Sequence, residues 1–367
     1  MLETQDLMVK QERTSHLTEM FDTSYVCIRV IRLAESVVIH VESLTKVFEG
    51  SFKAVDNVSL DIQTKEVFGL LGPNGAGKTT TVKMLSTLLR PTSGIAVVDG
   101  HNVMEDADGV RRTIGIVFQD PALDDELTAR ENLDFHARMY NMDGEQRRER
   151  MIEVLKLVDL HDRADVPVKK YSGGMKRRLE IARGLMHYPK VLFLDEPTLG
   201  LDAQTRRSIW DYVARLNKEQ NVTIFLTTHY MEEADFLCSR VAIMDRGKLV
   251  AVDSPEDLKN SIGSDLVTLE CSDPDRFAER LRSVDWIENL KRHESTIIVG
   301  TKHSAERIPE VVNLARDIGV RVLSIETRKP TLEDVFLYYT GTKMRESEAN
   351  TSDRMKTMHR QSARRFR

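Results

Sequence analysis

The sequence predicts an α/β fold built around a mostly parallel sheet, and three observations carry that prediction. Continuously apolar runs recur along the first two thirds of the chain, as expected for strands that are buried on both faces of a sheet. Helical patterns separate these runs, and a glycine-rich loop joins one of them to a helix. The apolar runs are Val67–Leu71, Ile114–Phe118, Val191–Leu194 and Val222–Leu226.

Composition excludes several classes of protein. The 367 residues include 53 Lys and Arg against 58 Asp and Glu, a net charge of −5, which argues against a dedicated nucleic-acid binder. No apolar run approaches the roughly 20 residues needed to cross a bilayer, so we expect any membrane role to be peripheral. The three cysteines have no CxxC spacing. They indicate neither a disulfide framework nor a zinc site, and they favour a reducing, cytoplasmic setting.

The elements of the main domain follow in chain order. Residues 1–36 are polar and mixed in charge, which predicts a poorly ordered N-terminal extension. Strand-like patterning begins at Val37–Val41 and continues with alternating apolar residues over 58–62. We predict one α/β domain over 37–263, interrupted at about 120–170 by a strongly charged helical insertion.

A smaller α+β unit is predicted over 264–340. Its last helix, 331–339, is expected to begin with a capping box formed by Thr331 and Asp334. The tail 341–367 has eight Lys and Arg against three Asp and Glu, which predicts a disordered basic segment. The unit's other predicted elements are strands over 266–269, 296–299 and 320–325 and helices over 275–281 and 305–318.

A phosphate-binding loop is predicted directly after the strand Val67–Leu71. Its eight residues match G-x-x-x-x-G-K-[ST] in full, and a helical pattern follows over 80–89. Glycines let successive N–H groups turn inward around an anion, and the helix N-terminus adds positive potential. We expect Lys78 to neutralise nucleotide phosphates and Thr79 to ligate Mg²⁺, with Thr80 next in the site. The eight residues are Gly72, Pro73, Asn74, Gly75, Ala76, Gly77, Lys78 and Thr79.

Two carboxylates, Asp195 and Glu196, end the strand that begins at Val191. Ligands of open α/β sheets bind at the carboxyl ends of the strands. We expect Asp195 to hold Mg²⁺, largely through water, and Glu196 to polarise the water that attacks the γ-phosphate. The alternative is that both carboxylates only cap the next helix.

A glycine turn, Tyr171–Met175, opens another helix whose first turn carries Lys176, Arg177 and Arg178. Cations at a helix N-terminus oppose the helix dipole by about 0.3–1 kcal/mol each. Broken local rules are typical of functional sites, so we expect an anion to approach this helix end. The alternative is a solvated run of charge after a flexible turn.

With these motifs the chain resembles the ATP-binding subunits of ABC transporters over residues 37–255, including their P-loop NTPase fold with a helical subdomain. Ser172, Gly173 and Gly174 look like the family's signature motif. The resemblance implies ATP and Mg²⁺ as cofactors and an ATP-dependent homodimer, or a heterodimer with a related ATPase. It assigns further site residues: Gln119 as the glutamine that senses Mg²⁺, water and the membrane partner, Asp202 in the D-loop, His229 as the switch histidine, and Phe48 as the adenine-stacking aromatic, with Phe52 as a competitor.

The C-terminal unit narrows the resemblance. The Tyr171–Met175 variant and the segment Pro330–Phe336 resemble daunorubicin- or multidrug-resistance exporter ATPases, which implies a separately encoded transmembrane permease and a peripheral location on the cytoplasmic face of the membrane. Nucleic acid is not an expected partner. The alternative is an ABC ATPase that acts on ribosomes or in DNA repair. Ribosome-acting relatives carry two cassettes. Repair ATPases have a long coiled coil between the phosphate loop and the signature, whereas Lys78 and Ser172 of this chain are only 94 residues apart.

Overall fold

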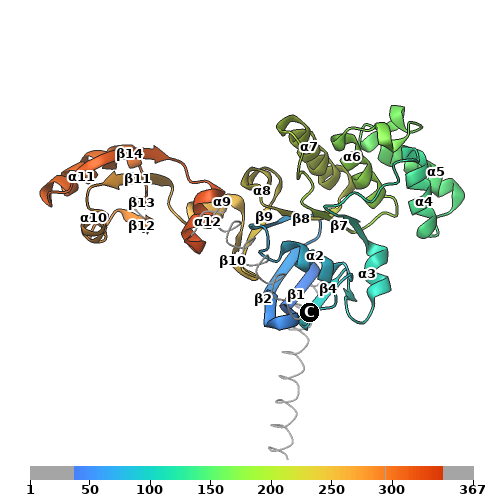
Figure 1. Cartoon of the computed structure of the whole chain (residues 1–367), viewed down its shortest axis with the longest axis horizontal. Coiled ribbons are helices and arrows are strands. Elements are labelled where there is room, and N and C mark those ends of the chain that lie inside the picture. The colour runs from blue at the N-terminus through green and yellow to red at the C-terminus, as the bar shows by residue number, and fades with distance from the viewer. Residues whose placement is uncertain (1–36, 294, 342–367) are drawn as a thin grey trace, which may run out of the picture.

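The computed structural model describes residues 37–293 and 295–341. It confirms the predicted α/β class (Figure 1). The predicted N-terminal extension, 1–36, and all of the predicted basic tail after Gly341 lie outside the described residues.

The central sheet has six strands in the order β10-β9-β3-β8-β7-β6, and the five from β9 to β6 are parallel. Every residue of β3, β7 and β8 is buried, as the apolar runs in their sequences predict. A tight turn returns the chain antiparallel from β9 into the edge strand β10. The strands are β3 (Val67–Leu71), β6 (Ile114–Val117), β7 (Val191–Asp195), β8 (Thr223–Thr228), β9 (Arg240–Asp245) and β10 (Lys248–Asp253).

The first strands form a separate antiparallel sheet in the order β2-β1-β4-β5, and β4 and β5 were not predicted. A short 3-10 turn, η1 (Glu49–Ser51), connects β1 to β2. Such a turn can join only antiparallel strands, because a parallel pair needs a crossover of a dozen or more residues. The strands are β1 (Val37–Phe48), β2 (Phe52–Gln63), β4 (Ser93–Val98) and β5 (His101–Asn102).

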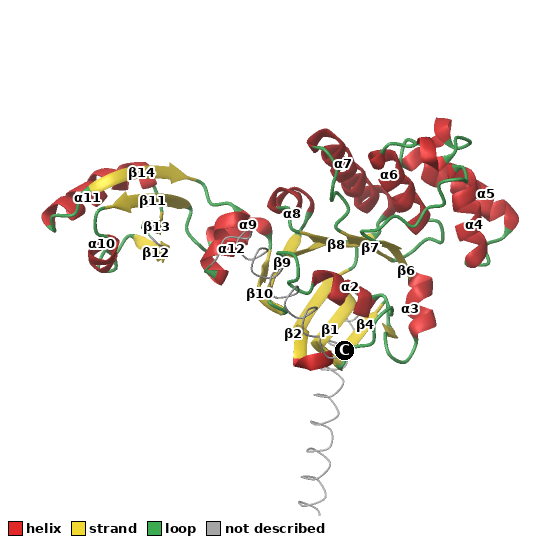
Figure 2. Ribbon diagram, viewed as in Figure 1, coloured by secondary structure: helices red, strands yellow, loops and turns green. Residues whose placement is uncertain are grey.

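The insertion is helical, as predicted, and α6 packs against both of its long helices, α4 and α5. These three helices lie at the opposite end of the molecule from the C-terminal unit (Figure 2). The helix after the phosphate loop ends at Leu85, before Thr87 adopts a left-handed conformation. The bounds are α2 (Lys78–Leu85), α3 (Ala107–Thr113), α4 (Ala129–Met139), α5 (Gly144–Leu157), η2 (His161–Arg163), η3 (Val168–Lys170), α6 (Gly173–Gly184), α7 (Ala203–Gln220), α8 (Met231–Leu237) and α9 (Pro255–Asn260).

The C-terminal unit is an antiparallel sheet in the order β12-β13-β11-β14, with its own hydrophobic core around Phe277 and Leu269. The strand β12 was not predicted, because charged residues interrupt its apolar alternation. The elements are β11 (Asp265–Cys271), α10 (Pro274–Leu281), β12 (Ile287–His293), β13 (Thr296–Thr301), α11 (Ser304–Asp317) and β14 (Val322–Arg328).

The last helix, α12 (Leu332–Thr340), packs away from that core. Its buried residues Leu332, Val335 and Phe336 belong to the hydrophobic cluster that also contains residues of the central sheet, α8 and α9. Tyr339, on the same predicted face, is 39% exposed. The helix therefore attaches the C-terminal unit to the main domain.

Asp334 organises the start of α12. Its carboxylate accepts hydrogen bonds from the Thr331 N–H and hydroxyl, which completes the predicted capping box, and it pairs with both terminal nitrogens of Arg328. Burial alone would raise the pKa of Asp334, but the bonds from Arg328 and Thr331 outweigh it and lower that pKa. The ionised form of Asp334 is therefore more stable in the folded protein than in the unfolded chain.

We expect Asp334→Asn to lower the free energy of unfolding by about 1–3 kcal/mol at pH 7. A group with a lowered folded-state pKa contributes stability above its unfolded pKa of about 3.9 and loses it as the pH falls through the folded value. The difference between wild type and variant should thus shrink below about pH 4. Thermal unfolding at several pH values measures it. Glu333→Gln, an exposed change on the same helix turn, is the control, and an equal effect of both would contradict the role of Asp334.

Candidate functional site

The phosphate loop connects β3 to α2 and requires glycine at two positions with positive φ. Gly75 has φ 80° and Gly77 has φ 110°. A Cβ on Gly77 would lie 2.4 Å from the carbonyl oxygen of Ala54, so any other residue would displace the β2 backbone. The loop therefore packs closely against β2, while Asn74 and Gly75 at its tip remain exposed.

Lys78, the first residue of α2, lies across this loop. Its side chain is only 4% exposed. Nζ donates to the carbonyl oxygens of Gly72, at 2.7 Å, and Pro73, at 3.1 Å. It also pairs with Oε1 of Glu196 at 3.1 Å. The ammonium group is thus held inside the curve of the loop, beside the carboxylate of the residue that follows β7, a strand separated from β3 in the sheet by β8.

Thr79 and Asp195 bring two oxygens together beside the loop. The Thr79 hydroxyl donates to Oδ1 of Asp195 at 3.1 Å, and the same Oδ1 accepts from the Thr227 hydroxyl at 2.5 Å. Oxygen ligands of an octahedral Mg²⁺, at about 2.1 Å from the ion, lie about 3.0 Å apart. Thr79 and Asp195 therefore fit a magnesium ion that takes its other ligands from water and phosphate.

Glu196 occupies a constrained position after β7. It is a non-glycine residue with φ 47°, and its N–H donates to the Thr227 carbonyl and hydroxyl oxygens. Its carboxylate lies between Lys78 and His229, whose Nδ1 is 3.2 Å from Oε2. Burial opposes ionisation of Glu196, but His229 and Lys78 together outweigh burial and lower its pKa. The carboxylate is therefore ionised at neutral pH.

Other predicted site residues lie outside this contact network. Gln119 follows β6 and is exposed. Phe48, 41% exposed, and Phe52, 36% exposed, face each other across the β1–β2 turn, so both aromatics stand at the same edge. Within a single chain, the predicted adenine, signature and D-loop residues do not contact the phosphate loop through any hydrogen bond or ion pair of the described residues.

The signature turn and the D-loop meet each other instead. Ser172 caps α6 by accepting from the Met175 N–H, and Ser172 and Gly173 are exposed. Asp202 caps α7 through Thr205, whose methyl carbon would lie 2.4 Å from a Cβ on Gly174. Glycine at 174 therefore permits α7 to pack against the start of α6.

The three cations of α6 do not form a free positive patch, because each of them has hydrogen-bond or ion-pair partners, and the expected approach of an anion to this helix end stays a prediction. Lys176 pairs with Asp125, and Arg178 donates to the Val158 carbonyl and the Tyr212 hydroxyl. Arg177 is buried among backbone carbonyls. Any anion attraction by this turn must come from its N–H groups and helix dipole.

Sequence reasoning missed Thr227 and the buried pair formed by Arg177 and Glu180. Thr227 gave a usable signal, since it is a hydroxyl residue near the carboxyl end of a buried strand. The pair of Arg177 and Glu180 gave a weaker sequence signal, namely opposite charges at i, i+3 spacing on a predicted helix.

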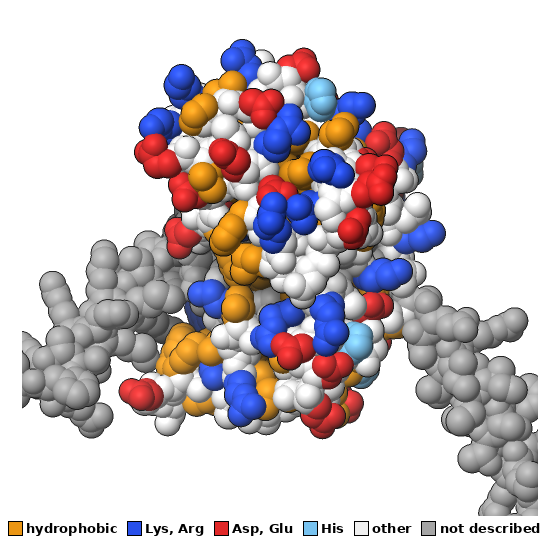
Figure 3. All heavy atoms as spheres, turned by 90° about the vertical axis from the view of Figure 1, so that its right-hand side faces the viewer, with side chains coloured by type: hydrophobic (Ala, Val, Ile, Leu, Met, Phe, Trp, Pro, Cys, Tyr) orange, Lys and Arg blue, Asp and Glu red, His pale blue; other side chains and the backbone are white. Residues whose placement is uncertain are grey.

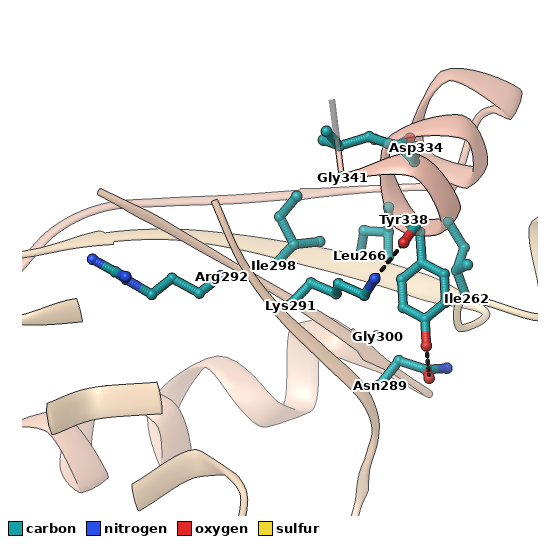
Figure 4. Close-up of a pocket in the computed structure, with 11 residues that line it drawn as sticks. Ile262, Leu266, Asn289, Lys291, Arg292, Ile298, Gly300, Asp334, Tyr338 and Gly341 are labelled. Atoms are coloured by element: carbon teal, nitrogen blue, oxygen red, sulfur yellow. Dashed lines mark hydrogen bonds between the residues drawn. The ribbon is translucent and has the colours of Figure 1, made fainter. Parts of the chain in front are cut away.

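A cavity in the C-terminal unit lies between its sheet and α12 (Figure 4). Apolar side chains such as Leu266 and Ile298 line it, as does Tyr338, whose hydroxyl donates a 2.9 Å hydrogen bond to Asn289. Its volume is about 50 Å³, which is room for one or two water molecules. This volume is too small to hold a nucleotide.

Comparison with known proteins agrees with the geometry. A family model described as "ABC transporter" matches residues 55–199, and one described as "ATP-binding protein DrrA1-3-like, C-terminal domain" matches 254–340. The daunorubicin resistance ATP-binding protein DrrA2 of Streptomyces coeruleorubidus is 41% identical over 82% of this chain and 94% of its own length. The chain belongs to the ABC transporter ATP-binding family.

Other relatives of this ABC ATPase extend the comparison. The linearmycin resistance ATP-binding protein LnrL of Bacillus subtilis is 37% identical over 83% of this chain and 99% of its own. The solved structure of cbiO1 from Clostridium perfringens, part of the cbiONQ complex, has a TM-score of 0.58 and 30% identity over 61% of this chain and 91% of its own. A dimeric cassette, MJ0796 bound to ADP and Pi, has a TM-score of 0.53 and 32% identity, over 59% and 98% of the two chains.

None of the helices in the described part of this ABC ATPase combines the length and apolar character needed to span a bilayer.

Proposed function

We propose that the chain is the ATP-hydrolysing motor subunit of an exporter whose permease is a separate membrane protein. The observation that carries the proposal is the buried cluster in which Lys78, Glu196 and His229 meet beside the phosphate loop. The printed names of relatives, daunorubicin and linearmycin resistance ATP-binding proteins, support export. They do not favour the alternative of an ATPase acting on ribosomes or DNA.

The residues have separable roles in hydrolysis. The loop N–H groups and Lys78 bind the phosphates, and Thr79 and Asp195 hold Mg²⁺, which supplies charge neutralisation at the phosphate oxygens. A γ-phosphate competes with Glu196 for Lys78, because both carry negative charge. Glu196 is then free to orient the attacking water, and His229, 3.2 Å from it, holds the carboxylate in place.

A head-to-tail dimer completes this site. Ser172 and Gly173 are exposed at the N-terminus of α6, which presents N–H groups suited to an anion. A second copy that places this turn over the bound phosphates gives two sandwiched nucleotides at one symmetric interface. The dimeric, ADP-bound cassette among the similar solved structures supports the formation of a dimer.

The surface of this chain that contacts the permease is proposed to lie at the helical end of the molecule. Phe135 and Met139, one turn apart on α4, are 64% and 67% exposed. Gln119 is exposed on the segment that leads from β6 into this lobe. Figure 3, which views the end formed by α3, α4 and α5, has hydrophobic side chains scattered among charged ones. Such a mixed face suits a cytoplasmic loop of the permease, through which this subunit reaches the membrane.

Dimerisation provides the test. We expect the Glu196→Gln protein to form a dimer by light scattering with Mg-ATP and a monomer with ADP. Gly173→Asp, added to Glu196→Gln, should abolish the dimer while nucleotide binding persists. Its carboxylate would repel the partner's phosphates, whereas the folded monomer tolerates a Cβ at this exposed position, since the nearest atom to a Cβ on Gly173 is 3.6 Å away.

Gly173→Ala in the same background is the control and should still dimerise. A monomer in Mg-ATP both alone and with the permease would contradict the sandwich. A dimer that survives Gly173→Asp would place the interface elsewhere on the molecule.

A further inference from the structure

The side chain of Arg177 joins three distant segments of the main domain. It is 7% exposed, and all five of its N–H groups are used. Nε donates to the Pro197 carbonyl at 2.8 Å. Nη1 donates to the Phe118 carbonyl at 2.6 Å and to Glu180 at 2.9 Å, and Nη2 donates to the carbonyls of Asp195, at 3.1 Å, and Glu196, at 3.3 Å.

Glu180 extends the same contact to the other side of Gln119. Its Oε1 accepts from the Ala122 N–H at 2.9 Å while Oε2 pairs with Arg177. The pair thus forms hydrogen bonds with the backbone on both sides of Gln119, at Phe118 immediately before it and at Ala122 three residues after it. Glu180 is 2% exposed, so both members of the pair are shielded from bulk water.

The same guanidinium supports Glu196 in a conformation that its backbone disfavours. A non-glycine residue at φ 47° costs about 1–3 kcal/mol and persists only when its surroundings hold it. The Thr227 oxygens hold its N–H, and Arg177 holds its carbonyl oxygen. The direction of the Glu196 carboxylate therefore depends on Arg177.

We infer that Arg177 and Glu180 are positioning residues that tie the Gln119 segment and the signature helix α6 to the backbone of Glu196. When the Gln119 segment is displaced, the carboxylate of Glu196 that orients water and the signature residue Ser172 therefore move with it. The inference rests on the proposed function, in which Glu196 acts on the attacking water. It assigns the pair no contact with nucleotide.

The test separates turnover from binding in the full-length chain. Arg177→Lys keeps the charge but leaves at most three donors for four carbonyls and a carboxylate. We expect ATP hydrolysis at saturating Mg-ATP to fall about 10- to 100-fold, with the Kd for a fluorescent ATP analogue changed less than about threefold. Amide hydrogen exchange should accelerate at residues 119–122 and 196–199.

Arg178→Lys is the matched control. It is the same substitution one residue along α6, but its contacts, Val158 and Tyr212, lie away from Glu196. It should leave turnover and exchange at both segments near the wild-type values. Should Arg177→Lys fail to fold, Glu180→Gln, which keeps the size and an acceptor oxygen, replaces it, with the same turnover, binding and exchange comparisons.

Two results would overturn the inference: turnover of the Arg177 variant within about twofold of wild type, or an equal loss in the Arg178 control. Glu196→Gln, measured in parallel, shows whether the positioning role of Arg177 or the proposed role of Glu196 fails. If Glu196→Gln is inactive while Arg177→Lys is active, only the positioning role fails. If Glu196→Gln is active, the proposed role of Glu196 in the function fails.

Discussion

Glu196→Gln is expected to bind ATP at least as tightly as the wild type and to hydrolyse it about 10²–10⁴ times more slowly. The amide is nearly isosteric and leaves Lys78, Thr79 and Asp195 unchanged, so the phosphate contacts survive. It removes the charge that activates water. It also removes the negative group 3.1 Å from Lys78 that competes with the γ-phosphate.

Single-turnover hydrolysis and equilibrium binding measure the two effects separately. Glu219→Gln, an exposed change on α7, is the control and should resemble the wild type in both. Turnover of Glu196→Gln close to the wild-type value would reduce Glu196 to a strand-end carboxylate. His229 or Asp202 would then be tested as the group that positions water.

Local motifs explain how the residues of the candidate nucleotide site could be selected from the sequence. The strand Val67–Leu71, the loop and the start of α2 follow one another directly, so their chemistry is contained in one segment. Asp195 and Glu196 could be added because parallel strands present their carboxyl ends at a common edge. That Lys78 and Glu196 pair at 3.1 Å is a consequence of β3 and β7 both flanking β8.

Non-local pairing explains what sequence reasoning missed. β4 joins β1 across more than forty residues, and no feature of its own sequence names that partner. Arg177 was interpreted through its own helix turn, whereas its acceptors come from the ends of β6 and β7. The choice between Phe48 and Phe52 stays open for a related reason: they are register partners with nearly equal exposure.

Lys78→Ala is expected to lose ATP binding itself, in contrast to Glu196→Gln. Lys78 is the buried cation inside the loop, 4% exposed, and hydrogen bonds to charged groups are worth about 1.5–3 kcal/mol. Its loss should therefore weaken ATP binding about 10- to 100-fold. It also leaves Glu196 without the cation that helps to lower its pKa, so the remaining negative charge repels the γ-phosphate further.

Titration with a fluorescent ATP analogue separates Lys78→Ala from Glu196→Gln, although both should be inactive in hydrolysis. Lys83→Ala, an exposed change on the same helix α2, is the matched control and should bind like the wild type. The double variant Lys78→Ala with Glu196→Gln adds a further comparison. Because the amide no longer repels the phosphate, it should recover part of the lost affinity. Wild-type affinity in Lys78→Ala would mean that the loop N–H groups alone bind the phosphates, and the role assigned to Lys78 would be wrong.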